Sequence, residues 1–123
     1  MEELYLKFVI QEHHATHIHW DFRLEMDGTL KSWAIPKGVS TVVGVKRLAI
    51  QVEDHDFSFI NFEGTIEEGV YGAGKIMIWD SGAYDLLEKS DKSIEIVLHG
   101  KKIDGRYVIL YWKEKNWLIF KKT

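Results

Sequence analysis

The sequence contains no cysteine and only one proline among its 123 residues. Disulfide bonds and thiolate metal sites are therefore excluded, and we expect a cytoplasmic protein. No apolar run approaches the roughly eighteen residues that a membrane-spanning helix needs, and there is no signal-peptide pattern. We therefore expect no membrane partner.

The sequence also lacks an excess of basic residues. Its net charge of −3 argues against a broadly basic face for nucleic acid, so any contact with DNA must come from a local patch together with a bound cation. The length predicts one domain over residues 1–123, with 1–7 as a short lead-in. Five Trp, five Tyr and six Phe beside the single proline favour sheet over helix.

Polar and apolar residues alternate without a break from His17 to Met26. A period of two predicts a half-buried strand with its apolar side on the core. The other side carries imidazoles, carboxylates and a guanidinium in register, whereas an ordinary solvated strand would carry Lys, Thr, Glu and Ser. The polar set is His17, His19, Asp21, Arg23 and Glu25, and the apolar set is Ile18, Trp20, Phe22, Leu24 and Met26.

The polar side of this strand predicts a metal site beside an anion site. Side chains at positions i and i+2 of a strand are rooted roughly 6.5–7 Å apart, so His19 and Asp21 can share one metal through bonds of about 2.0–2.2 Å. His13, just upstream, could supply a third ligand, and such a set leaves open positions that suit catalysis. Arg23 follows on the same side with a fork of donors for phosphate. Together they predict a phosphate ester as substrate.

Asp27-Gly28 is a strong signal for a two-residue hairpin turn, because it separates two alternating segments. The turn fixes which residues face each other on the two strands. The expected pairs are Phe22 with Trp33, Trp20 with Ile35, Arg23 with Ser32 and Asp21 with Ala34. Pro36 then ends the second strand.

The rest of the chain predicts short strands at close spacing, over 8–11, 47–55, 75–80, 94–98, 106–112 and 117–121, with a turn at Ser81-Gly82. Such a pattern predicts a mainly β fold, a small antiparallel barrel or sandwich with little helix. Residues 64–74 are rich in glycine but lack the ending of a P-loop, so they predict tight turns and bulges. In 47–55, the expected apolar side is Leu48, Ile50 and Val52, and the expected polar side is Gln51, Glu53 and His55, from which His55 could reach a phosphate beside the metal.

Two other functions also fit parts of this pattern. His19 and Asp21, with His55 or His99 from further along, satisfy the two-His-one-carboxylate set of non-haem iron oxygenases on β-sandwich folds, with Arg106 for an oxoacid co-substrate. A non-catalytic barrel that binds DNA ends is the third possibility. Release of phosphate from a 3′-phosphorylated oligonucleotide separates a phosphoesterase from both.

Short motifs follow one another in order along the chain: Gln11-Glu12-His13-His14-Ala15, His19-Trp20-Asp21-Phe22-Arg23-Leu24-Glu25, Trp33-Ala34-Ile35-Pro36-Lys37-Gly38, Val52-Glu53-Asp54-His55 and Glu68-Gly69-Val70-Tyr71-Gly72-Ala73-Gly74. Together they resemble the signature of the 3′-phosphoesterase domain of bacterial DNA ligase D. The resemblance runs from Phe8 to about Lys121, and the order of several motifs makes it specific.

The resemblance implies a small β-barrel with its active site in a groove on one side. It implies an enzyme that processes DNA 3′ ends in end joining, removing a 3′-phosphate or a terminal ribonucleotide. The implied cofactor is Mn²⁺, or another divalent transition metal such as Zn²⁺ or Co²⁺, and the implied partners are DNA 3′ ends. By motif position, His13, His19 and Asp21 resemble the metal ligands, Arg23 and His55 the phosphate-binding and catalytic pair, and Gln11 and Glu53 catalytic residues that support the site.

The sequence departs from the family pattern at two places. Phe59 stands at the substrate-binding position where the family usually has Tyr, four residues beyond His55. The lost hydroxyl predicts weaker binding or protonation of the phosphate, which Ser58 or Tyr71 could offset. Only seven residues precede Phe8, so we expect the family's N-terminal arm to be missing, ribonucleotide removal to be reduced, and the chain to be a stand-alone version that works with a separately encoded ligase and polymerase.

Overall fold

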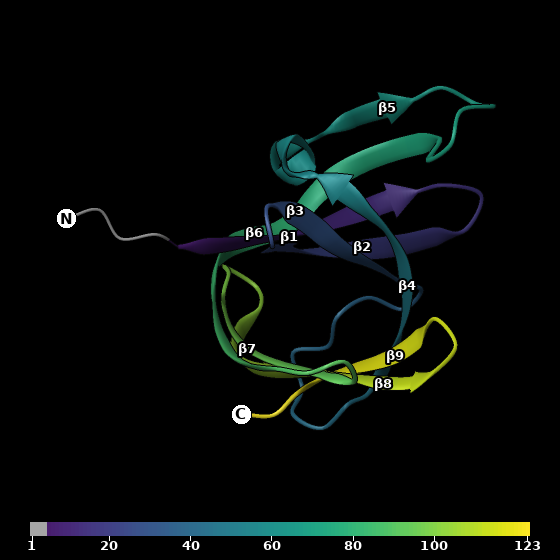
Figure 1. Cartoon of the computed structure of the whole chain (residues 1–123). Coiled ribbons are helices and arrows are strands. Elements are labelled where there is room, and N and C mark those ends of the chain that lie inside the picture. The colour runs from purple at the N-terminus through teal and green to yellow at the C-terminus, as the bar shows by residue number, and fades with distance from the viewer. Residues whose placement is uncertain (1–4) are drawn as a thin grey trace.

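The computed structural model describes residues 5–123 and shows a small, almost entirely β protein (Figure 1). Of the expected lead-in 1–7, residues 1–4 lie outside the described part, and Leu6 and Lys7 already belong to the first strand. In the part of the chain that is described, no helix has the length and apolar character to cross a membrane. The elements are β1 (Leu6–His14), β2 (Ile18–Met26), β3 (Thr29–Ile35), β4 (Arg47–Asp56), the 3₁₀ helix η1 (Phe57–Asn61), β5 (Gly64–Ile66), β6 (Gly74–Lys89), β7 (Ser93–His99), β8 (Asp104–Lys113) and β9 (Asn116–Lys121).

The strands form one closed antiparallel barrel. Their order in the sheet is β1-β2-β3-β4-β9-β8-β7-β6-β5, and β1 also pairs with β6, which closes a ring of eight strands. β5 pairs with β6 beyond this ring and stands above the barrel (Figure 1). The expected small antiparallel barrel with little helix is confirmed.

The β2–β3 hairpin has the predicted turn and register. Asp27 and Gly28 adopt φ angles of 55° and 79°, as a two-residue type I′ turn requires. The pairs Phe22–Trp33, Trp20–Ile35, Arg23–Ser32 and Asp21–Ala34 all form as expected. The apolar side of β2 faces the barrel core, except that Ile18 at the start of the strand is 46% exposed.

The predicted turn at Ser81-Gly82 is wrong, because β6 continues through these residues to Lys89. Gly82 instead allows neighbouring residues to pack closely against its backbone. A Cβ at Gly82 would lie 2.1 Å from the backbone oxygen of His99 and 3.3 Å from a ring carbon of Phe8. The long strand therefore needs glycine where it crosses from pairing with β1 to pairing with β7.

The predicted faces of residues 47–55 are also wrong. Ala49 is the residue of β4 that is buried in the core, whereas Leu48 is 37% exposed. The register with β3 shifts between the pairs Leu30–His55 and Ser32–Val52, so β4 has one extra residue there. Such a bulge turns side chains that are three residues apart toward the same side. Val52 and His55 consequently both line the pocket described below.

Candidate metal and phosphate site

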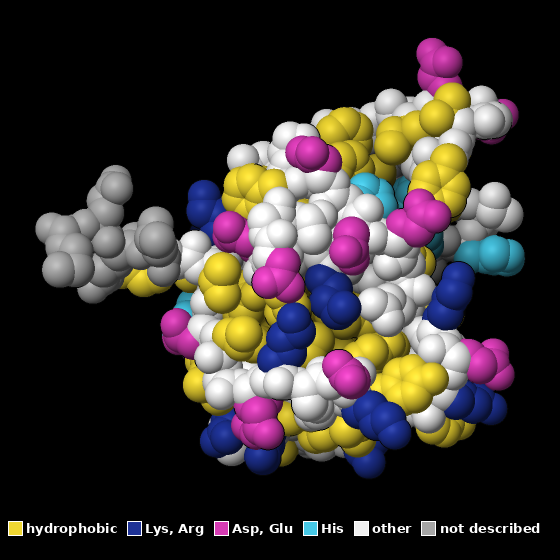
Figure 2. Space-filling model, viewed as in Figure 1, with side chains coloured by type: hydrophobic (Ala, Val, Ile, Leu, Met, Phe, Trp, Pro, Cys, Tyr) yellow, Lys and Arg dark blue, Asp and Glu magenta, His cyan; other side chains and the backbone are white. Residues whose placement is uncertain are grey.

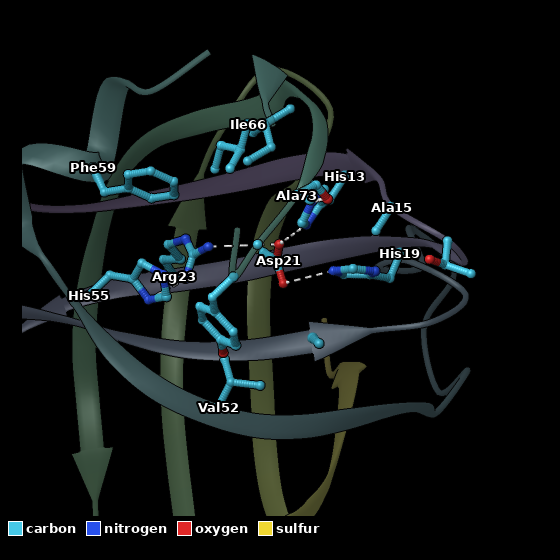
Figure 3. Close-up of a pocket in the computed structure, with 15 residues that line it drawn as sticks. His13, Ala15, His19, Asp21, Arg23, Val52, His55, Phe59, Ile66 and Ala73 are labelled. Carbon is cyan, nitrogen blue, oxygen red and sulfur yellow. Dashed lines mark hydrogen bonds and ion pairs between the residues drawn. The ribbon is translucent and has the colours of Figure 1, made fainter. Parts of the chain in front are cut away.

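A pocket of about 600 Å³ lies outside the barrel wall, against β1, β2, β3 and β4 (Figure 3). Its other walls come from η1, β5 and the turn over residues 67–73, which we call the flap turn. A second apolar cluster, formed by Val9, Leu30 and Ile60 with Phe57, Phe59 and Ile78 packed against it, holds η1 over this side of the sheet.

The covering elements bury polar residues that the sequence pattern placed on an outer face. Asp21 is 5% exposed and Arg23 is 3% exposed. In the space-filling view, histidine side chains are visible in the hollow below the β5 end of the molecule, whereas many lysine and arginine side chains gather at the opposite end (Figure 2). The pocket thus brings buried charged groups together.

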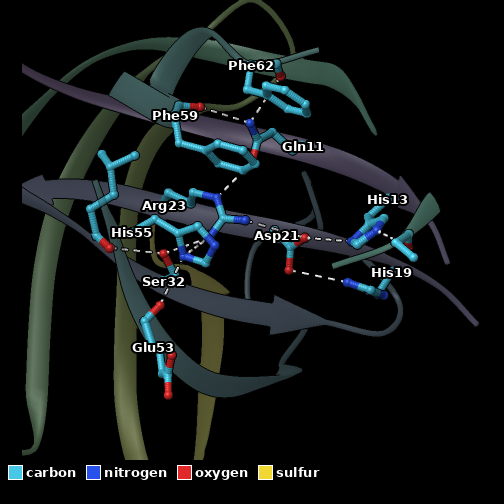
Figure 4. A network of polar contacts seen from close by, with 12 residues as sticks. Gln11, His13, His19, Asp21, Arg23, Ser32, Glu53, His55, Phe59 and Phe62 are labelled. Carbon is cyan, nitrogen blue, oxygen red and sulfur yellow. Dashed lines mark hydrogen bonds and ion pairs between the residues drawn. The ribbon is translucent and has the colours of Figure 1, made fainter. Parts of the chain in front are cut away.

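His13, His19 and Asp21 form a group that could hold a metal ion. His13 on β1 lies directly across from His19 on β2, and Asp21 follows two residues later on the same side. Asp21 Oδ2 lies 3.2 Å from His13 Nδ1, and Asp21 Oδ1 lies 3.3 Å from His19 Nε2 (Figure 4). One ligand atom from each residue falls within 4.8 Å of the others. The structure therefore brings together the three predicted ligands.

Backbone carbonyls fix the orientation of both imidazoles. His13 Nε2 lies 2.9 Å from the oxygen of Ala73, and His19 Nδ1 lies 3.0 Å from the oxygen of His17. Because a carbonyl oxygen can only accept, these contacts place a ring proton on His13 Nε2 and on His19 Nδ1, and the opposite nitrogen of each ring faces the Asp21 carboxylate. A proton can bridge such a nitrogen and the carboxylate, as in the hydrogen bond from His19 to Asp21, and a divalent transition metal, which this donor set suits, can take the same place.

The charges in the site shift the pKa values of its groups. A hydrogen bond to Asp21 raises the pKa of His19, although burial opposes this. Burial alone would raise the pKa of Asp21, but the hydrogen bond from His19 and the charge of Arg23 outweigh burial and hold the pKa below its usual value. Asp21 is thus an anion at neutral pH, as a metal ligand must be.

Arg23 is held on several sides at once. Its Nε donates to Gln11 Oε1 at 2.7 Å, and its Nη1 donates to Ser32 Oγ at 2.8 Å (Figure 4). The guanidinium carbon lies 5.0 Å from the centre of the Phe59 ring. Nη2 lies 3.7 Å from Asp21 Oδ2 and so faces the candidate metal ligands. This is the end of the fork that a bound phosphate can reach.

His55 stands beside Arg23 at the other end of the pocket. Its Nδ1 lies 3.0 Å from Arg23 Nη1 and 3.1 Å from the backbone oxygen of Glu53. A guanidinium only donates and a carbonyl oxygen only accepts, so Nδ1 bonds to one of the two at a time; when it accepts from Arg23, the proton of the neutral ring is on Nε2. Burial and the Arg23 charge lower the pKa of His55, which keeps the ring neutral at pH 7. His55 can therefore donate a hydrogen bond to a phosphate from Nε2.

Comparison with known proteins points to one family. The family model described as the DNA ligase D 3′-phosphoesterase domain matches residues 11–111. The chain belongs to this family. A multifunctional non-homologous end joining protein LigD of Mycolicibacterium smegmatis is 47% identical over 123 residues, which cover 91% of this chain and 16% of that protein.

Two further relatives carry similar names. The LigD protein of Pseudomonas aeruginosa is 44% identical over 94% of this chain and 15% of its own length. That of Mycobacterium tuberculosis strain H37Rv is 49% identical over 90% of this chain and 15% of its own length. The 3′-phosphoesterase domain described here thus spans about a sixth of the length of these relatives.

Gln11 and Glu53, the two residues expected to support the site, contribute to it in different ways. The amide nitrogen of Gln11 donates to the backbone oxygens of Phe59 at 3.1 Å and Phe62 at 3.2 Å, so Gln11 links Arg23 to η1. Glu53 reaches the network through its backbone oxygen, while its exposed side chain points away from the pocket (Figure 4). The Phe59 ring stacks on Phe62 with centres 4.6 Å apart.

Other candidate residues lie outside this group. His99 pairs with Asp85 at 2.8 Å, and Arg106 pairs with Glu95 at 2.8 Å. Neither His99 nor Arg106 is among the described residues that line the pocket. The oxygenase arrangement that uses His99 and Arg106 is therefore not assembled at this site.

Sequence analysis missed two contributors to the site. Ser32 was predicted only as the residue opposite Arg23 in the hairpin, but its buried hydroxyl accepts from the guanidinium. The predicted hairpin register placed Ser32 opposite Arg23, so the hydrogen bond between them could have been predicted. The Ala73 carbonyl, which orients His13, lies 60 residues away in the chain, and no local pattern indicates that contact.

Proposed function

We propose that this domain is a metal-dependent phosphoesterase that acts on DNA 3′ ends, with Mn²⁺ as its cation. The observation that carries the proposal is the convergence of one ring nitrogen each of His13 and His19 on the Asp21 carboxylate, beside Arg23 Nη2. A cation site beside a buried guanidinium fits a phosphoryl group, because the cation can polarise one oxygen while the guanidinium neutralises the charge on another.

The proposed reaction is hydrolysis of a terminal phosphoester. A divalent metal held by His13, His19 and Asp21 would polarise a phosphoryl oxygen and lower the pKa of a bound water. Arg23 Nη2 binds a second oxygen of the phosphoryl group and compensates its charge in the transition state. His55 Nε2 donates to the phosphate or to the leaving oxygen. Gln11 and Ser32 position Arg23 and do not touch the substrate.

The substrates we propose are DNA ends that carry a 3′-phosphate or a 3′-terminal ribonucleotide. The proposed setting is end joining in the cytoplasm, with a ligase and a polymerase as partners; the names of the relatives support end joining. Phe59 offers no hydroxyl to the phosphate. Of the described residues that line the pocket, Thr16 and Tyr71 carry one, whereas Ser58 does not line it.

An oligonucleotide assay tests this function. We expect purified protein with Mn²⁺ to release inorganic phosphate from a 3′-phosphorylated duplex, and not from the same duplex with a 5′-phosphate. Zn²⁺, Co²⁺ and Mg²⁺ are compared at equal concentration, and a 3′-ribonucleotide end is assayed in parallel. Binding of the 3′-phosphate end without turnover would favour the non-catalytic barrel. A requirement for O₂ would favour the oxygenase.

A further inference from the structure

The flap turn connects β5 to β6 and forms one edge of the pocket. It is built from two successive turns, in which Val70 N donates to Glu67 O at 3.2 Å and Ala73 N donates to Val70 O at 3.0 Å. Gly69 and Gly72 have φ angles of 84° and 82°, a conformation that disfavours other residues. The turn therefore has a defined shape set by its own hydrogen bonds and glycines.

Tyr71 is the aromatic residue of this turn. It is 78% exposed, yet it lines the same pocket as Arg23. An exposed aromatic ring leaves a large apolar surface in water, and at the mouth of a pocket such a ring commonly meets a ligand. Val70 beside it is also exposed but is not among the described lining residues.

The flap turn is fixed relative to the metal ligands. Ala73, two residues after Tyr71, accepts from His13 Nε2 at 2.9 Å. Gly74 then packs so closely on β1 that a Cβ would lie 2.4 Å from the backbone oxygen of His14. The distance between Tyr71 and a phosphate bound at Arg23 is therefore set by the fold.

The pocket walls formed by η1, β5 and the flap turn contribute no charged side chain among the described lining residues. Asp21, Arg23 and the three histidines belong to β1, β2 and β4, whereas η1, β5 and the flap turn contribute Phe59, Ile66 and Tyr71 (Figure 3). A terminal nucleotide has the same division, with an anionic phosphate and a flat, uncharged base. Stacking suits an enzyme that must accept any terminal base, because every base has a π-face.

We propose that Tyr71 stacks on the base of the terminal nucleotide whose phosphate is held at Arg23. The inference rests on the proposed function, since it assigns a binding role within the same site. It makes Tyr71 a substrate-binding residue whose ring, rather than its hydroxyl, carries the effect. Removing the ring weakens binding by roughly tenfold, the usual order for loss of one base–aromatic stack.

The test combines two changes in the protein with one in the substrate. Parent, Tyr71→Phe and Tyr71→Ala are compared on a 3′-phosphorylated strand with a normal terminal base or a tetrahydrofuran abasic residue. We expect Tyr71→Ala to raise KM about tenfold with little change in kcat, and Tyr71→Phe to behave as the parent. For the parent, KM should rise by about the same factor on the abasic strand. For Tyr71→Ala, KM should be the same on the abasic and the normal strand. Val70→Ala is the matched control on the same turn.

Anisotropy of a labelled 3′-phosphate strand gives the same comparison without turnover. If the parent releases no phosphate, the proposed function fails, while the anisotropy ratios still decide whether Tyr71 senses the base. Equal losses for Tyr71→Phe and Tyr71→Ala would assign the effect to the hydroxyl and overturn stacking. Parent-like affinity of Tyr71→Ala for the normal strand, with an unchanged circular dichroism spectrum, would also overturn it.

Discussion

His13 Nε2 lies 2.9 Å from the carbonyl oxygen of Ala73, so a candidate metal ligand on β1 is oriented by the flap turn on the far side of the pocket. The same imidazole directs its other nitrogen to Asp21. An outer hydrogen bond of this kind sets both the tautomer and the direction of a ligand. The metal site and the edge of the pocket are consequently parts of one hydrogen-bonded unit.

Asp21→Asn should abolish metal-dependent activity. An amide keeps the shape of the side chain but removes the negative charge that the cation needs, so the loss should exceed the roughly 10- to 100-fold that follows removal of an outer hydrogen-bond partner. Thermal unfolding provides a second measurement, because Mn²⁺ should raise the Tm of the parent and not that of the variant. Asp85→Asn, at an exposed pair with His99, is the control. Full activity of Asp21→Asn would reject the metal assignment.

Arg23→Lys should lower kcat/KM by about 10²–10³-fold, the usual effect of removing one donor aimed at transition-state charge. A single ammonium cannot bond to Gln11 and Ser32 and still present a fork to phosphate. Leaving these buried partners unsatisfied should also lower the free energy of unfolding by about 1–3 kcal/mol, measurable in urea. Arg106→Lys is the control, since Arg106 pairs with Glu95 away from the pocket. Turnover equal to that of the parent would place Arg23 outside the site.

Phe59→Tyr should leave phosphate release unchanged or raise it. The ring already contacts Arg23 and His55, with its centre 5.0 Å from the guanidinium carbon and 5.1 Å from the His55 ring, so an added hydroxyl lies near the phosphate site. Initial rates on the 3′-phosphate duplex measure the effect, with Phe62→Tyr in the stacked neighbour as control. A large fall in rate would show that this position does not face the substrate.

In metal-free protein, we expect His19 to titrate above its usual pKa near 6.5 and His55 below it, as followed by NMR of the ring protons. Asp21→Asn should lower the His19 midpoint, because the hydrogen bond that raises it is lost. His19 therefore contributes stability that is full below pH 6.5 and lost as pH rises through its folded pKa. The contribution of His55 is full above pH 6.5 and lost as pH falls toward its folded pKa. Protons should also displace the metal as His19 becomes charged.

Much of the site could be predicted because its elements are local. His19, Asp21 and Arg23 share one side of a strand by their spacing alone, and Asp27-Gly28 fixed the partner strand and its register. The same logic failed on β4, where one extra residue opposite Lys31 turns Val52 and His55 toward the same side. A bulge depends on the neighbouring strand, which a pattern within 47–55 does not contain.

Long-range packing accounts for the other differences. Gly82 resembles a turn residue in sequence, but glycine is needed there because the backbone of His99 leaves no room for a Cβ. The alternation in β2 predicted a half-buried strand, whereas η1 covers its polar side because Val9, Leu30 and Ile60 form a second apolar cluster. Arg23, which faces the proposed phosphate site, is therefore buried.

That second cluster has a consequence for ionic strength. Mobile ions screen charges at exposed positions over a Debye length of about 10 Å at 0.1 M salt, but they act far less on groups shielded by protein. Added potassium chloride should therefore slow the encounter with DNA and leave the turnover of bound ends nearly constant. Because the small apolar layer under η1 shields the buried charges, salt should affect the rate of DNA binding and not the rate of phosphate release.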